Sequence, residues 1–157
     1  MEPIVIYWAA PCFTQAERIW NRLCAEELRK KGYKVILPQD EAKKFITADK
    51  ADFKGLAENC YNQAIESDVM MAVVDGPDPD SGMSMESGFK IRDDGYVIGV
   101  RTDFRVSEDG QLNAMFRLFN TIIYFPSFNE NYQELCNKID EEIKRVLKTQ
   151  NKGGRND

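Results

Sequence analysis

The chain has 157 residues, of which 43% are hydrophobic and 30% charged, as expected for one soluble globular domain with a substantial core. The formal net charge of -5 argues against a nucleic-acid partner, because contact with a phosphate backbone needs a basic face. No apolar run approaches the roughly 20 residues of a membrane span, and the start, MEPIVIYWAA, lacks the basic segment of a signal peptide.

Short apolar runs alternate with amphipathic segments along the chain. Strands are predicted at Ile4 to Trp8, Tyr33 to Leu37, Val69 to Val74, Tyr96 to Val100 and Thr121 to Phe125. Helices are predicted from the capping box of Thr14 and Glu17 to Gly32, over 51–66, from about Gly82 to Arg92, over 113–119, and from about Asn129 to Lys148. This alternation predicts a doubly wound, parallel α/β sheet of five strands flanked by helices.

The remaining segments are predicted to be loops or tail. Residues 39–50 and 102–111 are polar and lack a clear period. The helix over 51–66 is predicted to face inward with Phe53, Leu56, Ala57, Cys60, Ala64 and Ile65. No linker divides the chain, so we expect one domain over 1–148 and a frayed polar tail over 149–157.

An acidic turn, DGPDPDSGMSMESGFK at 75–90, follows the third predicted strand. A strand, a turn rich in Pro, Gly and Asp, and an amphipathic run form the usual site at the carboxyl edge of an α/β sheet. Glu86 is the candidate catalytic group, although acids are also common early in helices because they complement the helix dipole. Met83 and Phe89 surround it with apolar bulk, and Gly82 lets a ligand approach closely. Near the positive end of a helix, Glu86 should stay ionised at neutral pH, the state that a nucleophile needs.

The residue types that are missing narrow the chemistry. There is no histidine, which removes Ser-His-Asp and Cys-His catalysis and the usual imidazole metal sites. The sequence has four cysteines, Cys12, Cys24, Cys60 and Cys136, and none of them forms a CxxC pair. We therefore expect neither a disulfide nor a zinc site, and we expect the protein to be located in the cytoplasm. The first loop, AAPCF, lacks both the GxGxxG pattern and a P-loop lysine. We expect neither a metal nor a cofactor.

Other candidates each have a structural and a functional interpretation. Asp80 could cap a helix or bind sugar hydroxyls, whereas Asp75 and Asp78 beside Gly and Pro are ordinary turn formers. Tyr7 ends the first strand at the same sheet edge, where a tyrosine is more often a packed aromatic with a bonded hydroxyl. Phe13, in the first loop, is a core residue by default but could line a base.

Four stretches together resemble the nucleoside 2-deoxyribosyltransferase family: IYWAAPCFTQAE, AIESDVMMAVVDG, DPDSGMSMESG and LNAMF. Their order and spacing carry the resemblance, especially D-S-G-x-x-x-E-x-G. It implies a flavodoxin-like sheet and an enzyme that exchanges the bases of 2′-deoxynucleosides. Glu86 would attack C1′, the base would leave, and a second base would take the sugar from the ester with net retention.

The resemblance also implies roles for other residues. Tyr7 would position Glu86, and Asp80 would bind the sugar hydroxyls. The implied substrate contacts of the same chain are Phe13, Gln39 and Gly82.

Asn113 and Met115 would reach into a neighbouring subunit's site, near the 5′ end of the sugar. The implied partners are therefore 2′-deoxynucleosides, free purine or pyrimidine bases, and further copies of the chain in a dimer or hexamer. Two positions depart from the family. Tyr61 stands where an aspartate contacts the leaving base, which leaves the proton donor open, and Ser87 replaces an aliphatic residue.

Two rival functions use the same fold. A 2′-deoxynucleoside 5′-monophosphate N-glycosidase would use the same glutamate with water as acceptor, but such relatives tend to have a serine at the position of Asn113 and a Gly- and Arg-rich first loop. A non-catalytic nucleotide-sensing or signalling module is also compatible with the sheet. The joint presence of Tyr7, Asp80, Glu86 and Asn113 favours the enzyme.

Overall fold

The computed structural model describes residues 2–105, 112–126, 128 and 130–153, and its centre is a parallel sheet of five strands. The strands are β1 (Val5–Ala9), β2 (Lys34–Ile36), β3 (Val69–Val73), β4 (Tyr96–Arg101) and β5 (Thr121–Tyr124). They lie in the order β2-β1-β3-β4-β5, and every neighbouring pair is parallel. This is the flavodoxin-like order, so the predicted fold class is confirmed.

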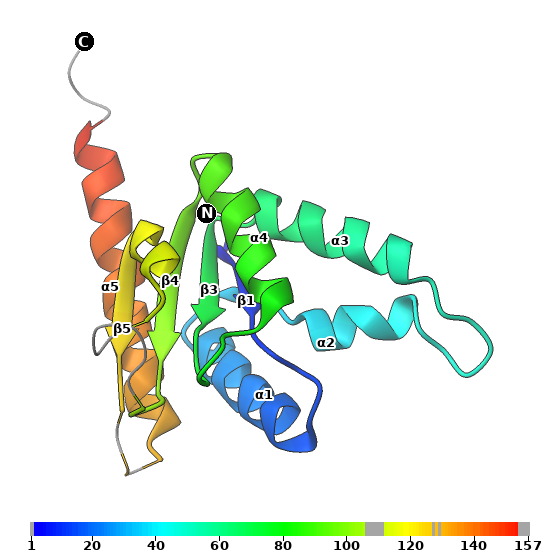
Figure 1. Cartoon of the computed structure of the whole chain (residues 1–157). Coiled ribbons are helices and arrows are strands. Elements are labelled where there is room, and N and C mark those ends of the chain that lie inside the picture. The colour runs from blue at the N-terminus through cyan, green and yellow to red at the C-terminus, as the bar shows by residue number, and fades with distance from the viewer. Residues whose placement is uncertain (1, 106–111, 127, 129, 154–157) are drawn as a thin grey trace.

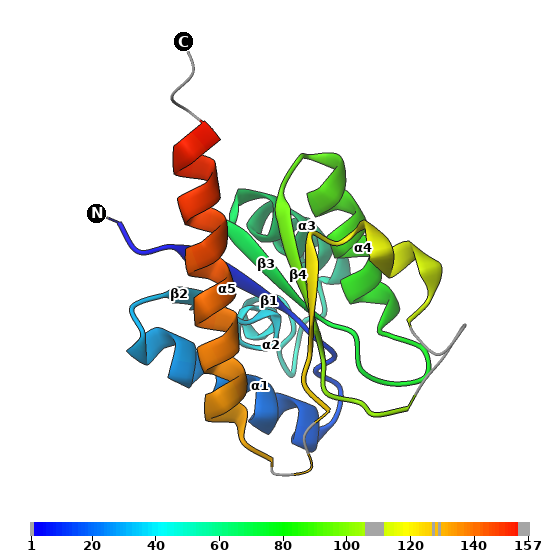
Figure 2. The ribbon, with the colours of Figure 1, turned by 90° about the vertical axis from the view of Figure 1, so that its left-hand side faces the viewer.

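Helices cover both faces of the sheet. Figure 2 shows α1 (Gln15–Lys30) and α5 (Tyr132–Gly153) on one face, with α3 (Phe53–Glu66) and α4 (Ser81–Arg92) behind the strands. The short η3 (Ala114–Leu118) lies beside α4. Because successive side chains of a strand point to opposite faces, Trp8 packs in the core under α1 and α5, whereas Tyr7 belongs to the core under α4.

The start of α1 agrees with its predicted capping box. Thr14 Oγ1 accepts from the backbone N–H of Glu17 at 3.2 Å, and Glu17 Oε2 accepts from the backbone N–H of Thr14 at 2.7 Å. The helix is followed by Gly32 in the left-handed region, with φ +97. The first loop, between β1 and α1, is therefore held at its far end.

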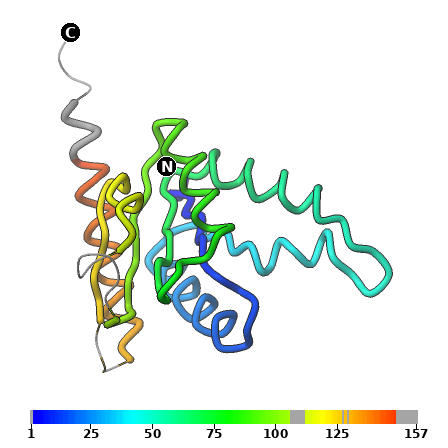
Figure 3. The backbone as a smooth tube through the Cα atoms, viewed as in Figure 1, coloured from blue at the N-terminus to red at the C-terminus, as the bar shows by residue number. Residues whose placement is uncertain are grey.

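The segment between β2 and β3 differs most from prediction. Part of the expected loop is helical, as α2 (Pro38–Glu41) and η1 (Ala42–Lys44), and this segment extends away from the sheet together with the first half of α3 (Figures 1 and 3). Phe53, expected to face inward, is therefore 67% exposed, and Ala57 is exposed too. Of the six residues expected to face inward on α3, Ala64 alone is fully buried.

The end of the chain is more regular than expected. α5 continues to Gly153, five residues past the predicted end at Lys148, so 149–153 of the expected tail are helical. No proline interrupts this stretch, and its Gln and Lys are good helix formers. Residues 106–111 of the second predicted loop and 154–157 of the tail lie outside the described residues. None of the described helices is long and apolar enough to cross a membrane.

Candidate active site

Tyr7 and Glu86 meet above the carboxyl half of the sheet. Tyr7 lies fully buried on β1, beside Met70 of β3, and points toward α4. Its hydroxyl donates a hydrogen bond to Glu86 Oε1 at 2.9 Å. The structure thus brings together two residues that are 79 positions apart in the sequence, as the resemblance implied.

Burial controls the charge of Glu86. It raises the pKa of this carboxyl from the ordinary 4.5 to about 7; the hydrogen bond from Tyr7 lowers the pKa, and the negative charge of Asp80 raises it again. Glu86 was expected to stay ionised at neutral pH, but a pKa of about 7 leaves it only partly ionised there. Glu86 is the sixth residue of α4, which begins at Ser81, so it lies beyond the first turn where the helix dipole acts.

Asp80 caps α4 and also influences Glu86. Its Oδ2 accepts from the backbone N–H of Met83 at 2.8 Å, and its backbone carbonyl accepts from the hydroxyl of Ser84 at 2.8 Å. The structural interpretation of Asp80 is thus correct, and its carboxylate is still close enough to raise the pKa of Glu86. Gly82 is exposed in the same first turn, where a Cβ atom would lie 3.1 Å from Asp80 Oδ2.

A second polar cluster fixes the acidic turn to the end of β4. Asp75 accepts from the backbone N–H groups of Thr102 and Asp103, at 2.6 and 2.9 Å. The guanidinium of Arg101, which is buried, donates to the carbonyl of Gly76 at 3.1 Å. Asp75 was predicted only to form a turn, and no local pattern indicates its link to a loop 27 residues away. The turn that leads into α4 is therefore anchored at its start.

The structure places the two predicted base contacts near the first loop in different environments. Phe13 is 75% exposed, so it is not a core residue. Gln39 is buried, and both ends of its amide already bind protein: Oε1 accepts from Asn21 at 3.1 Å, and Nε2 donates to the carbonyl of Arg18 at 3.0 Å. Gln39 thus connects α2 to α1, and its contact with a base stays a prediction.

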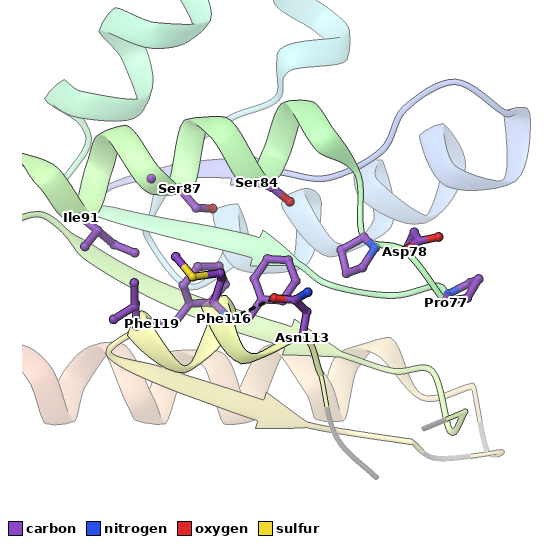
Figure 4. Close-up of a pocket in the computed structure, with 12 residues that line it drawn as sticks. Pro77, Asp78, Ser84, Ser87, Ile91, Asn113, Phe116 and Phe119 are labelled. Carbon is purple, nitrogen blue, oxygen red and sulfur yellow. Dashed lines mark hydrogen bonds between the residues drawn. The ribbon is translucent and has the colours of Figure 1, made fainter. Parts of the chain in front are cut away.

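Asn113 and Met115 belong to a pocket formed by α4 and η3. Asn113 caps η3, its Oδ1 accepting from the backbone N–H of Met115 at 3.0 Å. Both residues line a pocket of about 520 Å³ between α4 and η3. Figure 4 shows Ser84, Ser87 and Ile91 of α4 facing η3 across this pocket. Glu86 is not among the described residues that line this pocket.

The two positions that depart from the family are also resolved. Tyr61 is 44% exposed, and its ring packs edge-on against Phe89 at 5.2 Å between centroids, on the outer surface of α3 and α4. Cys60, one residue earlier, packs against the buried cluster that contains Tyr7. Sequence reasoning did not select Cys60 as a site residue, although its spacing from Ala64 predicted that it faces inward. Ser87 is buried and satisfies its hydroxyl by donating to the carbonyl of Met83 at 2.8 Å.

The arrangement suits nucleophilic chemistry by a carboxylate. Tyr7 holds one oxygen of Glu86, which leaves the other oxygen available for attack.

Over the described residues, no group of three or more Cys, Asp or Glu side chains gathers in a way that could hold a metal ion. The four cysteines are unpaired.

A family model matches the part of the chain that contains these residues. The model of the nucleoside 2-deoxyribosyltransferase family matches residues 6–120, a stretch that includes Tyr7, Asp80, Glu86 and Asn113. No protein with a curated function matches the chain in sequence.

Solved structures give the same picture of the fold. A conserved protein from Enterococcus faecalis V583 is 23% identical, with a TM-score of 0.71, and the match covers 89% of this chain and 99% of that one. A 2-deoxyribosyltransferase from Bacillus psychrosaccharolyticus is 17% identical, with a TM-score of 0.66, over 85% and 90%. The CMP N-glycosidase BcmB of Clostridium botulinum is 17% identical, with a TM-score of 0.60, over 88% and 98%. Identities this low show the fold alone, but the family model spans most of the chain, and the chain therefore belongs to the nucleoside 2-deoxyribosyltransferase family.

Proposed function

We propose that this protein exchanges the bases of 2′-deoxynucleosides through a covalent deoxyribosyl ester of Glu86. The observation that carries the proposal is the hydrogen bond of 2.9 Å from the Tyr7 hydroxyl to Glu86 Oε1, inside the segment that matches the family. A partly buried carboxylate held at one oxygen by a neutral donor is well arranged to attack with the other. No cofactor or metal is needed for this reaction.

The reaction consists of two displacements at C1′ of the sugar. Glu86 Oε2 attacks C1′, the N-glycosidic bond breaks, and its electron pair leaves with the base, which takes up a proton. A ring nitrogen of a second base then attacks C1′, gives up its proton, and releases the carboxylate. Each displacement inverts C1′, so the product keeps the original configuration.

The neighbouring residues support these steps. Tyr7 stays protonated and keeps donating to Glu86, because burial raises the pKa of its hydroxyl well above the usual range. Asp80 uses Oδ2 for the helix cap, and among the described residues no hydrogen bond to its Oδ1 is present, so that oxygen can accept from sugar hydroxyls. Phe13, exposed in the first loop, offers its ring to the base.

We further propose that active sites are shared between copies of the chain in a homo-oligomer, a dimer or hexamer. Asn113 and Met115 line a pocket between α4 and η3 whose described lining does not include Glu86. If they contact the 5′ end of the sugar, as the family resemblance implies, they must do so in a neighbour's site.

A direct assay tests the function. The protein is incubated with deoxyinosine and adenine, and the products are separated by chromatography. Deoxyadenosine is the expected product, and E86A, which lacks the nucleophile, should form none. If no pair of purine or pyrimidine bases exchanges, or if E86A remains active, the proposal is wrong.

One alternative is favoured by a specific observation, the similarity in fold to a CMP N-glycosidase. With water as acceptor, the same ester of Glu86 would be hydrolysed. The first loop, AAPCF, carries no arginine for a 5′-phosphate, which favours an unphosphorylated nucleoside and transfer. Free deoxyribose or its 5-phosphate as the main product would select the hydrolase.

A further inference from the structure

We propose that Asn21 of α1 is a specificity-determining positioning residue, whose buried amide fixes the orientation of the Gln39 amide toward the base. The proposal rests on the proposed function, in which Gln39 is expected to contact the base. Because Asn21 is only 3% exposed, it acts through other side chains and not by touching the base.

Gln39 lies at the same edge of the sheet as the reacting groups. β2 runs beside β1, with Ile36 opposite Tyr7, and Gln39 follows β2 as part of α2. Tyr7 binds Glu86, and the carboxyl ends of parallel strands meet at one edge of the sheet. The position of Gln39 just beyond β2 therefore suits contact with a base whose sugar is held at Glu86.

The hydrogen-bond partners of Asn21 leave its amide only one orientation. The indole N–H of Trp8 can only donate, and it binds Asn21 Oδ1 at 3.1 Å. The carbonyl of Pro11 can only accept, and it binds Asn21 Nδ2 at 3.0 Å. If the amide turned over, two donors would meet at Trp8 and two acceptors at Pro11, and these groups would lose their hydrogen bonds.

Asn21 in turn sets the orientation of Gln39. Asn21 Nδ2 also donates to Gln39 Oε1 at 3.1 Å, and Gln39 Nε2 donates to the backbone carbonyl of Arg18 at 3.0 Å. An indole that can only donate thus begins this chain of hydrogen bonds, and a carbonyl that can only accept ends it. Beyond these bonds Gln39 keeps one N–H and one lone pair of Oε1, and the places of both are fixed.

A base is recognised by the order of donors and acceptors along its edge. Adenine presents an amino donor beside a ring-nitrogen acceptor, whereas hypoxanthine presents a carbonyl acceptor beside an N–H donor. A glutamine whose N–H and lone pair have fixed places matches one order better than the other. A glutamine that is free to turn over matches both orders.

The first loop is held by the same helix, so the ring of Phe13 belongs to the same fixed unit. Asn21 binds the loop at the carbonyl of Pro11. Glu17 Oε2 accepts from the backbone N–H of Phe13 at 2.9 Å, and Arg18 Nη1 donates to the carbonyl of Phe13 at 2.9 Å. The exposed ring is therefore carried on a fixed backbone, as a surface against which a base can stack.

The preference between two acceptor bases measures the role of Asn21. The kcat/KM values for adenine and for hypoxanthine are determined with one common deoxynucleoside as the sugar donor. Their ratio should differ from one by about tenfold in the wild type, the effect of one well-placed hydrogen bond, and should fall close to one in N21A. The kcat at saturating base should change little, because Tyr7 and Glu86 are untouched. A purely structural role would lower both values together and keep the ratio.

W8F tests whether orientation is passed along the chain of bonds. It removes the donor that orients Asn21 and does not touch Gln39, so the ratio should again fall toward one. Y33F is the matched control, because it loses a hydrogen bond between elements, from the Tyr33 hydroxyl to Asp140 Oδ1 at 2.6 Å, and should keep the wild-type ratio. If N21A does not fold, W8F decides. A wild type that does not discriminate, an unchanged ratio in N21A or W8F, or an equal fall in Y33F would overturn the proposal.

A readout that needs no catalysis separates this proposal from the proposed function. In isotope-labelled protein, the NMR signal of the Gln39 side-chain amide, assigned by its loss in Q39E, reports how firmly this group is held. Its protons should exchange with solvent about tenfold faster in N21A than in the wild type, and Y33F should leave the rate unchanged. Equal rates in N21A and the wild type would overturn the proposal even if bases are exchanged. If the wild-type protein exchanges no bases, the proposed function fails, but this rate still decides whether Asn21 fixes Gln39.

Discussion

Replacing Glu86 by glutamine should stabilise the protein while abolishing base exchange. Burial raises the pKa of Glu86 from 4.5 in the unfolded chain to about 7 in the folded protein, so folding favours the protonated form. Stability is therefore full below pH 4.5 and falls as the pH rises toward 7. At 1.36 kcal/mol for each pKa unit, ionised Glu86 costs about 3 kcal/mol of unfolding free energy at pH 8, but only about 1 kcal/mol at pH 5.

Glutamine removes this cost because it has no charge, and its Oε1 can still accept from Tyr7. Urea unfolding of wild type and E86Q at pH 5 and pH 8 measures the difference. E86Q should be more stable by about 3 kcal/mol at pH 8 and by about 1 kcal/mol at pH 5. E41Q is a matched control, because Glu41 has a lowered pKa, caused first by its hydrogen bond from Lys44, and its loss should not stabilise at pH 8. An E86Q variant that gains nothing at pH 8, or gains equally at both pH values, would refute the reasoning.

Three further predictions concern activity. The kcat/KM for exchange should fall below a pH of about 7, because the free enzyme must ionise Glu86 before it can attack; a limb near 4.5 would contradict its burial. D80N should keep the cap on Met83, since asparagine caps as well as aspartate, but it should move the acid limb to lower pH by removing the charge that raises the pKa of Glu86. An unmoved limb would show that this charge does not reach Glu86, and a higher KM would support contact with the sugar. Co-expressed E86A and N113A chains should regain about a quarter of wild-type activity. Half of randomly paired dimers are mixed, and in each mixed dimer one of the two sites has Glu86 from one chain and Asn113 from the other. No recovery would argue against a shared site.

The fold could be predicted well from the sequence because its signals are local. Apolar runs mark all five strands, and Thr14 with Glu17 marks the start of α1. The region between β2 and β3 could not be predicted in the same way, because periodicity shows which face of a helix is apolar but not whether another element packs against that face. Phe53 lies on the apolar face of α3 and is still exposed, since that half of the helix extends beyond the sheet. Pro38, at the first position of α2, was the available signal for a helix there.

That Tyr7 and Glu86 lie together could be predicted from the sequence, but the electrostatics of the pair could not. Tyr7 and Glu86 could be found because each stands at the carboxyl end of a predicted strand or in the turn after it. The pKa of Glu86 could not be predicted, since it depends on burial by residues that are far away in the sequence. The same limit applies to Asp75, whose hydrogen-bond partners Thr102 and Asp103 follow another strand. Asn113 likewise lines a pocket between α4 and η3 that does not include Glu86 among its described residues, and no spacing in the sequence reveals this.

The raised pKa of Glu86 fits the proposed chemistry better than an ordinary carboxylate would. In the free protein, burial penalises the negative charge, and Asp80 adds to the penalty. In the proposed reaction, positive charge develops at C1′ as the glycosidic bond breaks, and in a site of low dielectric this charge attracts the carboxylate of Glu86 strongly. Burial thus destabilises the charged carboxylate in the free protein, and the developing positive charge stabilises it in the transition state. Such a difference between the ground state and the transition state increases the reaction rate. A non-catalytic binding module would carry the same cost in stability without this return, and for that reason an E86Q variant that is both more stable and inactive would be the clearest sign of an enzyme.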